Sequence, residues 1–149
     1  MARFDPPLRT PADRQALRQA VAEGVASICS DHTPVDEDGK QLPFAEAVPG
    51  ASSLELLLPL TLRWAVEMGL PLTVALARVT CDPASVLQIE RGTLAIGTEA
   101  DICVFDPQER WLATPEMLLS QGKNTPFVEQ QLVGRVRTTL VGGRVVFAR

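Results

Sequence analysis

The residue pattern of the chain changes near residue 91, and this change limits the folds that its 149 residues can form. Before it, apolar residues recur at helical spacing in segments that open with capping residues, as at Thr10-Pro11. After it, short β-rich runs are separated by turn residues, and Gly142-Gly143 indicates a hairpin. We therefore predict an α/β fold with a helical part over residues 1–91 and a small antiparallel β part over residues 92–149.

Individual elements can be placed within these two parts. Helices are predicted from Thr10 to Gly24, from Ser52 or Ser53 to Met68 with a kink at Pro59 and a stop at Gly69, over residues 73–80, and from a cap at Asp82. Strands are predicted over residues 25–30, 93–96, 101–105 and within 133–147, with a short helix at residues 114–116. The acidic, Pro- and Gly-containing stretch 31–51 is predicted to be a long loop.

Composition excludes some partners. The net charge of −4 and the pI near 5.0 disfavour nucleic acid, which needs a clustered basic face. The most apolar stretch, residues 54–62, is short and contains Glu55 and Pro59, so no membrane span is expected. The three cysteines lie in apolar runs without a Cys-x-x-Cys pair, which predicts buried, reduced thiols in a cytoplasmic protein.

Asp31 is the main candidate for chemistry, because it directly follows the predicted strand 25–30. Active sites of α/β folds gather at the carboxyl ends of strands, where a carboxylate can ligate a metal or move a proton. From position alone, a turn or helix cap is an equally good interpretation. His32 is the only histidine, and a lone histidine beside an acid is more often a hydrogen-bonded structural group than a zinc ligand.

Five segments together resemble the C-terminal portion of the bacterial type I dihydroorotases of the amidohydrolase superfamily. They are Asp-Pro-Pro-Leu-Arg at residues 5–9, Ser-Asp-His-Thr-Pro at 30–34, Phe-Ala-Glu-Ala-Val-Pro-Gly at 44–50, the Gly-x-Leu-x-x-Gly-x-x-Ala-Asp pattern at 92–101, and Ser-Gln-Gly-Lys-Asn-Thr-Pro-Phe at 120–127. The resemblance implies the last strand and helices of a (β/α)8 barrel over residues 1–91, followed by the small β part of that fold.

The same resemblance implies a function and a set of site residues. The family interconverts carbamoyl-aspartate and dihydroorotate in pyrimidine biosynthesis, with zinc bound in the complete fold. Asp31 corresponds to the aspartate that ligates the metal and acts as general acid/base. Asp5 and Val35 stand where the family has a substrate-contacting asparagine and a substrate-binding histidine, and Pro49 and Gly50 match a loop whose backbone contacts the substrate.

Three departures from the family pattern keep a second interpretation open. With one histidine, this chain is expected to bind no zinc and to be inactive alone. Val35 cannot bind a carboxylate, and an ionised Asp5 would repel an anionic substrate. The alternative is therefore a non-catalytic dihydroorotase homologue that acts as a structural partner of aspartate transcarbamoylase. An unpaired edge of the small β part could also favour self-association.

Overall fold

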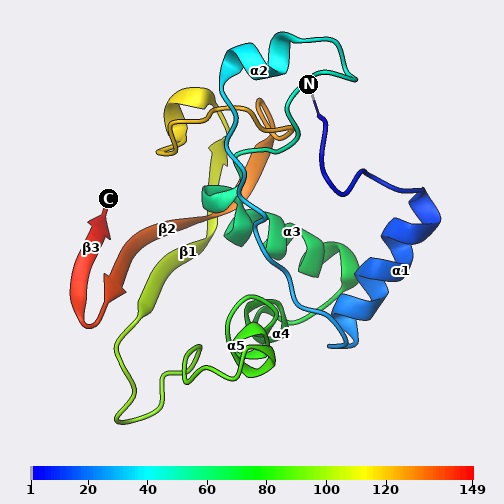
Figure 1. Ribbon diagram of the computed structural model, residues 1–149. Coiled ribbons are helices and arrows are strands. Elements are labelled where there is room, and N and C mark those ends of the chain that lie inside the picture. Colours follow the sequence, from blue (N-terminus) through cyan, green and yellow to red (C-terminus); the bar gives the residue numbers. More distant parts are fainter. Residues whose placement is uncertain (1) are drawn as a thin grey trace.

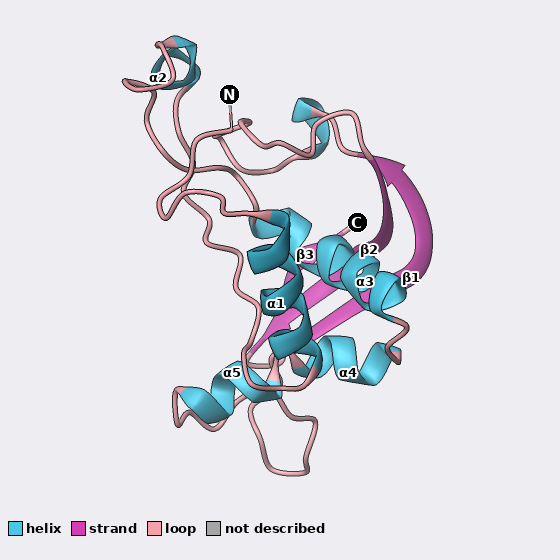
Figure 2. Cartoon of the chain, turned by 90° about the vertical axis from the view of Figure 1, so that its right-hand side faces the viewer, coloured by secondary structure: helices cyan, strands magenta, loops and turns pink. Residues whose placement is uncertain are grey.

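The computed structural model describes residues 2–149, in which α3 lies between α1 on one side and a small curved sheet on the other (Figures 1 and 2). The helices are α1 (Pro11–Ala22), α2 (Glu37–Gln41), α3 (Leu57–Met68), α4 (Leu72–Ala77) and α5 (Cys81–Val86), with the 3-10 turns η1 (Leu54–Leu56) and η2 (Pro115–Met117). The strands are β1 (Ile102–Leu112), β2 (Gln131–Val141) and β3 (Arg144–Ala148).

The start of α1 confirms the sequence signal. The Thr10 hydroxyl accepts a hydrogen bond from the Asp13 amide at 3.2 Å, and the Asp13 carboxylate accepts one from the Thr10 amide at 3.0 Å. This reciprocal capping box satisfies amides that have no partner within the helix. The hydrogen bonds from Thr10 also lower the pKa of Asp13.

The predicted start of α3 was wrong. Neither serine caps it, because Ser53 Oγ donates to the Ser30 carbonyl at 2.5 Å and Ser52 Oγ donates to the Gly122 carbonyl. Pro59 lies in the first turn of α3 rather than in its interior, so its missing N–H removes no bond from the middle of the helix. Gly69 ends the helix as predicted, in the left-handed conformation with a φ of 67°.

Two predicted strands are absent. Residues 25–30 lie outside the sheet, with a bend at Val25 and Ala26, and the amide of Ile28 donates instead to the Arg78 carbonyl at 3.0 Å. Residues 93–95 have no regular secondary structure, and Ile96 begins a turn. A strand is defined by a ladder of hydrogen bonds to a neighbour, and within residues 2–149 neither segment has one.

Two further local predictions need correction. The predicted loop 31–51 contains the short helix α2. The helix α5 begins at Cys81, and Asp82 does not cap it but forms an ion pair with Arg78.

The sheet has the predicted antiparallel hairpin. Its order is β1-β2-β3, with Gly142 and Gly143 turning the chain at φ values of 54° and 76°. The strand predicted at 101–105 extends to Leu112, paired with β2 from Ile102↔Leu140 to Leu112↔Gln131. The predicted helix at residues 114–116 is the single 3-10 turn η2.

The main core is shared between the two parts of the chain. Leu56 packs with Ala113, Leu118 and Leu132, each at most 2% exposed. Leu60, Trp111 and Phe127 pack around this cluster. The helical and strand-containing parts therefore bury apolar surface against each other, and a division into two domains at residue 91 stays a prediction.

The cysteines differ from the expectation. Cys29, Cys81 and Cys103 are all free and exposed. Their apolar neighbours predicted burial, but the segment around Cys29 is not covered by a neighbouring strand, and Cys81 begins a short surface helix. No helix of residues 2–149 is long and apolar enough to cross a membrane.

Candidate functional site

Asp31 has an unusual backbone conformation at the end of the segment 25–30. Its φ of 46° is in the left-handed region, which few residues other than glycine adopt. The side chain is exposed, and no group within residues 2–149 is recorded as bonding its carboxylate. A free carboxylate on a fixed, strained backbone is suited to proton transfer or metal ligation.

His32 has a structural contact. Its Nδ1 accepts hydrogen bonds from the amides of Ser53 and Leu54, at 3.0 and 3.1 Å. These are free amides at the start of η1, which leads into α3, so the imidazole does the capping that was expected of a serine hydroxyl. An Nδ1 whose lone pair accepts from two amides is not available to a metal.

A loop formed by residues 45–51 lies directly against the segment that carries Asp31. The Thr33 amide donates to the Ala51 carbonyl at 3.0 Å. Gly50 has a φ of 127°, and a Cβ at this position would be only 2.5 Å from the Thr33 carbonyl oxygen. Only glycine allows this approach. Pro49 and Gly50 are half-buried, and Gly50 packs against Thr33, two residues after Asp31.

The segment that contains Asp5 reaches the same loop through Arg3. The Gly50 amide donates to the Arg3 carbonyl at 3.0 Å. The Arg3 guanidinium donates to the carbonyls of Ala45 and Ala47, at 2.8 and 2.5 Å. Asp5 itself is exposed, two residues farther along the chain.

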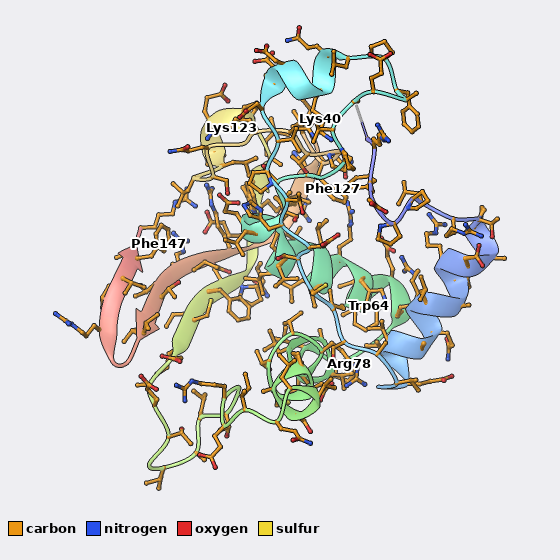
Figure 3. The ribbon with its side chains drawn as sticks, viewed as in Figure 1. Lys40, Trp64, Arg78, Lys123, Phe127 and Phe147 are labelled. Carbon is orange, nitrogen blue, oxygen red and sulfur yellow. The ribbon has the colours of Figure 1, made fainter. Side chains whose placement is uncertain are left out.

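Lys40 is a member of this site that the sequence did not reveal. It is only 7% exposed and lies on the side of α2 that faces the rest of the chain (Figure 3). Its ammonium donates to the carbonyls of Val48 and Gly50, at 2.6 and 2.8 Å. Burial, and to a lesser degree the positive charge of Arg3, lower the pKa of Lys40. A lysine that follows Asp36-Glu37-Asp38 resembles any solvated residue of an acidic loop, so no local signal could have found it.

Val35 does not face an open site. It is 9% exposed, and a Cβ added at Gly39 would lie 3.2 Å from its Cγ1 and 3.1 Å from Val48 Cγ2. The side chain therefore fills a small apolar space beside α2, where it can neither donate nor accept a hydrogen bond. Position 35 lies near the other candidates but contributes packing.

The segment at residues 120–127 supports the site from the other part of the chain. The Ser52 amide donates to the Asn124 carbonyl at 2.7 Å, and Asn124 Nδ2 donates to the Gly50 carbonyl at 3.4 Å. A Cβ at Gly122 would lie 2.6 Å from Pro34 Cβ. The resemblance of this segment to dihydroorotases thus has a physical reason, since it packs under both site segments.

A second contact fixes the same segment to η1. Ser120 donates to the Glu55 carboxylate through its amide at 2.6 Å and through its hydroxyl at 2.8 and 2.9 Å. Desolvation alone would raise the pKa of Glu55, but these hydrogen bonds outweigh it, and the pKa is lowered.

The donor set does not fit a complete metal centre. Within residues 2–149 there is no group of three or more His, Cys, Asp or Glu side chains that could hold a metal ion. His32 uses Nδ1 at the start of η1, and Asp31 is the single metal ligand that the resemblance implies in this chain. A hydrolytic zinc ion takes about three protein ligands, and the described residues do not supply them.

Comparisons with known proteins agree with the sequence resemblance. The Amidohydrolase family matches residues 6–146. A "Dihydroorotase-like protein" of Pseudomonas aeruginosa is 49% identical over 141 residues, covering 94% of this chain and 33% of that protein. A "Dihydroorotase" of Geobacter metallireducens is 42% identical over 149 residues, covering 99% of this chain and 35% of that protein. The chain thus spans about a third of the length of these relatives.

Solved structures of amidohydrolases match nearly the whole chain in fold. The D-hydantoinase (dihydropyrimidinase) from Thermus sp. matches with a TM-score of 0.86 at 25% identity, covering 98% of this chain and 33% of that one. The L-hydantoinase (dihydropyrimidinase) from Arthrobacter aurescens matches with a TM-score of 0.86 at 27% identity, covering 98% and 34%. The chain therefore belongs to the amidohydrolase family, as a dihydroorotase-type member that spans about a third of the fold.

Proposed function

We propose that this chain is the C-terminal portion of a dihydroorotase, which interconverts carbamoyl-aspartate and dihydroorotate in cytoplasmic pyrimidine biosynthesis. The observation that carries the proposal is the Asp31 carboxylate, free and on a strained backbone, beside the glycine-dependent 45–51 loop. Opening or closing a cyclic amide needs a group that moves a proton at the ring nitrogen, within reach of a held substrate. Relatives named dihydroorotase, at 42% and 41% identity over nearly the whole chain, support the same reaction.

Each residue has a definite part in this proposal. Asp31 is the general acid/base and one metal ligand of the complete fold, for which zinc is the proposed metal. The 45–51 loop contacts the substrate through its backbone. Gly50 already uses its amide and its carbonyl within the protein, so the Pro49 carbonyl is the group that we assign to the substrate. Asp5 borders the same site, and Val35 only maintains its packing.

The proposal also assigns the two parts of the chain. Residues 1–91 form the last part of the amidohydrolase barrel, and residues 92–149 form its small β part. The contacts of Asn124 and Ser120 with the first part support this assignment, because they give the second part a role in holding the site.

A comparison of this chain with the full-length protein tests the proposal. We expect no zinc that survives dialysis and no conversion of dihydroorotate by the 149-residue chain, since it offers one free ligand. We expect turnover by the full-length protein, lost in Asp31→Asn. Activity that is indifferent to Asp31→Asn would indicate contaminating enzyme. Stoichiometric zinc in the short chain, lost on Asp31→Ala, would contradict the ligand count.

A second candidate function is favoured by Val35 and Asp5. A buried valine in place of a substrate-binding histidine suits a non-catalytic homologue that acts as a structural partner of aspartate transcarbamoylase. In that case the full-length protein would lack both metal and dihydroorotase activity. It would also elute together with aspartate transcarbamoylase in size-exclusion chromatography, at a mass that neither protein has alone.

A further inference from the structure

We propose that Lys40 is a positioning residue that fixes the 45–51 loop, and with it the Pro49 carbonyl, in the conformation that receives the substrate. The role of the substrate in this inference rests on the proposed function. The role of the loop rests on contacts within the protein. Nothing in the resemblance assigns a role to position 40.

The geometry of the ammonium group supports this role. Lys40 Nζ bonds the carbonyls of two residues, Val48 and Gly50, that flank Pro49. Fixing both neighbours sets the orientation of the peptide group between them, so the Pro49 carbonyl cannot rotate freely. No hydrogen bond to that carbonyl is recorded from residues 2–149, which leaves it available to a ligand.

The surroundings of Lys40 show that the contact is specific. A buried lysine is normally paired with an acid, whereas no ion pair of Lys40 is recorded within the described part of the chain. The charged residue that affects the pKa of Lys40 is Arg3, which is also positive and also bonds carbonyls of the loop. A purely apolar side chain would fill this space without the desolvation penalty. The ammonium instead bonds the Val48 and Gly50 carbonyls, which an apolar side chain could not do.

The chain offers a matched control. Lys123 is its only other lysine, and its ammonium also donates to a backbone carbonyl, that of Leu118, at 2.7 Å. Lys123 lies in the segment that supports the site but makes no recorded contact with the 45–51 loop. Lys123→Met thus removes a similar lysine–carbonyl bond without releasing the loop.

The experiment compares Lys40→Met, Lys40→Gln, Lys40→Arg and Lys123→Met in the full-length protein. Amide hydrogen exchange of peptides covering residues 33 and 45–51 reports the loop, and steady-state kinetics with dihydroorotate report the site. We expect Lys40→Met to accelerate exchange there and to raise KM about tenfold with kcat nearly unchanged. Lys40→Arg, which keeps the charge and the donors, should restore slow exchange and a KM close to that of wild type. Lys123→Met, which lacks a contact with the loop, should leave the exchange of residues 45–51 unchanged.

Each outcome decides the proposal. Unchanged exchange in Lys40→Met would overturn it, and so would faster exchange with unchanged KM, because the role would then be structural only. If Lys40→Met does not fold, Lys40→Gln against Lys40→Arg gives the same comparison, since glutamine keeps a donor but loses the charge. If the full-length wild-type protein is inactive, the proposed function fails, while the exchange data still show whether Lys40 holds the loop.

Discussion

Two adjacent residues, Asp31 and His32, have opposite roles in this structure. The left-handed backbone of Asp31 leaves its carboxylate exposed, whereas the imidazole of His32 lies against the start of η1. From sequence position alone, Asp31 was equally well interpreted as a site residue or a cap, and His32 was more often a structural group than a zinc ligand. The segment that carries both side chains is held against the 45–51 loop by the contacts of Thr33 with Ala51 and Gly50.

The hydrogen bonds of His32 lead to a stability prediction. His32→Ala leaves the amides of Ser53 and Leu54 without their acceptor, which should lower the free energy of unfolding by about 1–3 kcal/mol. His32→Asn should retain most of the stability, because its Oδ1 can occupy the position of Nδ1 and accept the same bonds. Urea denaturation measures both variants. Equal losses would show that the two bonds do not stabilise the helix start.

Among the secondary-structure elements, helix α3 has one end that is specified by the local sequence and one that is not. Its C-terminus depends on one residue, Gly69, whose φ of 67° is accessible without strain only to glycine. Its N-terminus depends on His32, 21 residues away from Ser53, and on Ser120, 65 residues away from Glu55. The first end could be predicted from the sequence, and the second could not.

The C-terminal end of α3 allows a test of conformation alone. No atom lies within 4 Å of a Cβ built at Gly69, so Gly69→Ala meets no steric conflict. The strained φ should still destabilise the protein by about 1 kcal/mol. Gly69→Asn should lose less, because asparagine tolerates the left-handed region better. Thermal and urea unfolding of the two variants should give this order, and a stabilised Gly69→Ala would contradict it.

The N-terminal end gives a prediction about pH. The hydrogen bonds from Ser120 lower the pKa of Glu55 from its ordinary value of 4.5. The ionised carboxylate therefore stabilises the fold at neutral pH, and this contribution is lost as the pH falls through the lowered folded-state pKa. Glu55→Gln should be less stable than wild type at pH 7, and the difference should shrink on acidification below 4.5. Urea unfolding across this range measures it.

A control variant tests whether the pH dependence is specific to Glu55. Glu46→Gln changes an exposed carboxylate and should leave the pH dependence of stability close to that of wild type. If Glu55→Gln keeps the same stability difference from wild type at low and neutral pH, the contact with Ser120 does not depend on ionisation.

For the whole molecule, the main consequence of the fold is the core between the parts before and after residue 91. Leu56 of η1 is fully buried against Ala113, Leu118 and Leu132 from the second part. The segment at residues 120–127 adds polar contacts across the same boundary. The two parts should therefore unfold together rather than as separate domains.

Leu56→Ala tests this cooperativity. Removing a fully buried leucine should destabilise the chain by about 2–5 kcal/mol. Trp64 lies in α3 and Trp111 in β1, so fluorescence of the single variants Trp64→Phe and Trp111→Phe reports one part each. We expect one common midpoint, shifted equally by Leu56→Ala for both reporters. Separate midpoints would instead support two independently folding domains.

The sequence by itself determined the features that depend on neighbouring residues. These are the capping box of Thr10, the stop at Gly69, the Gly142-Gly143 hairpin and the family resemblance, which implies site roles for Asp31 and the Pro49-Gly50 loop. Tertiary structure decided whatever needs a distant partner. The segment 25–30 is not a strand because none pairs with it within residues 2–149, His32 caps a helix start that lies far along the chain, and Lys40 is buried by a loop that it also holds. Local patterns record conformational preference, whereas burial and hydrogen-bond partners are set only when separate segments meet.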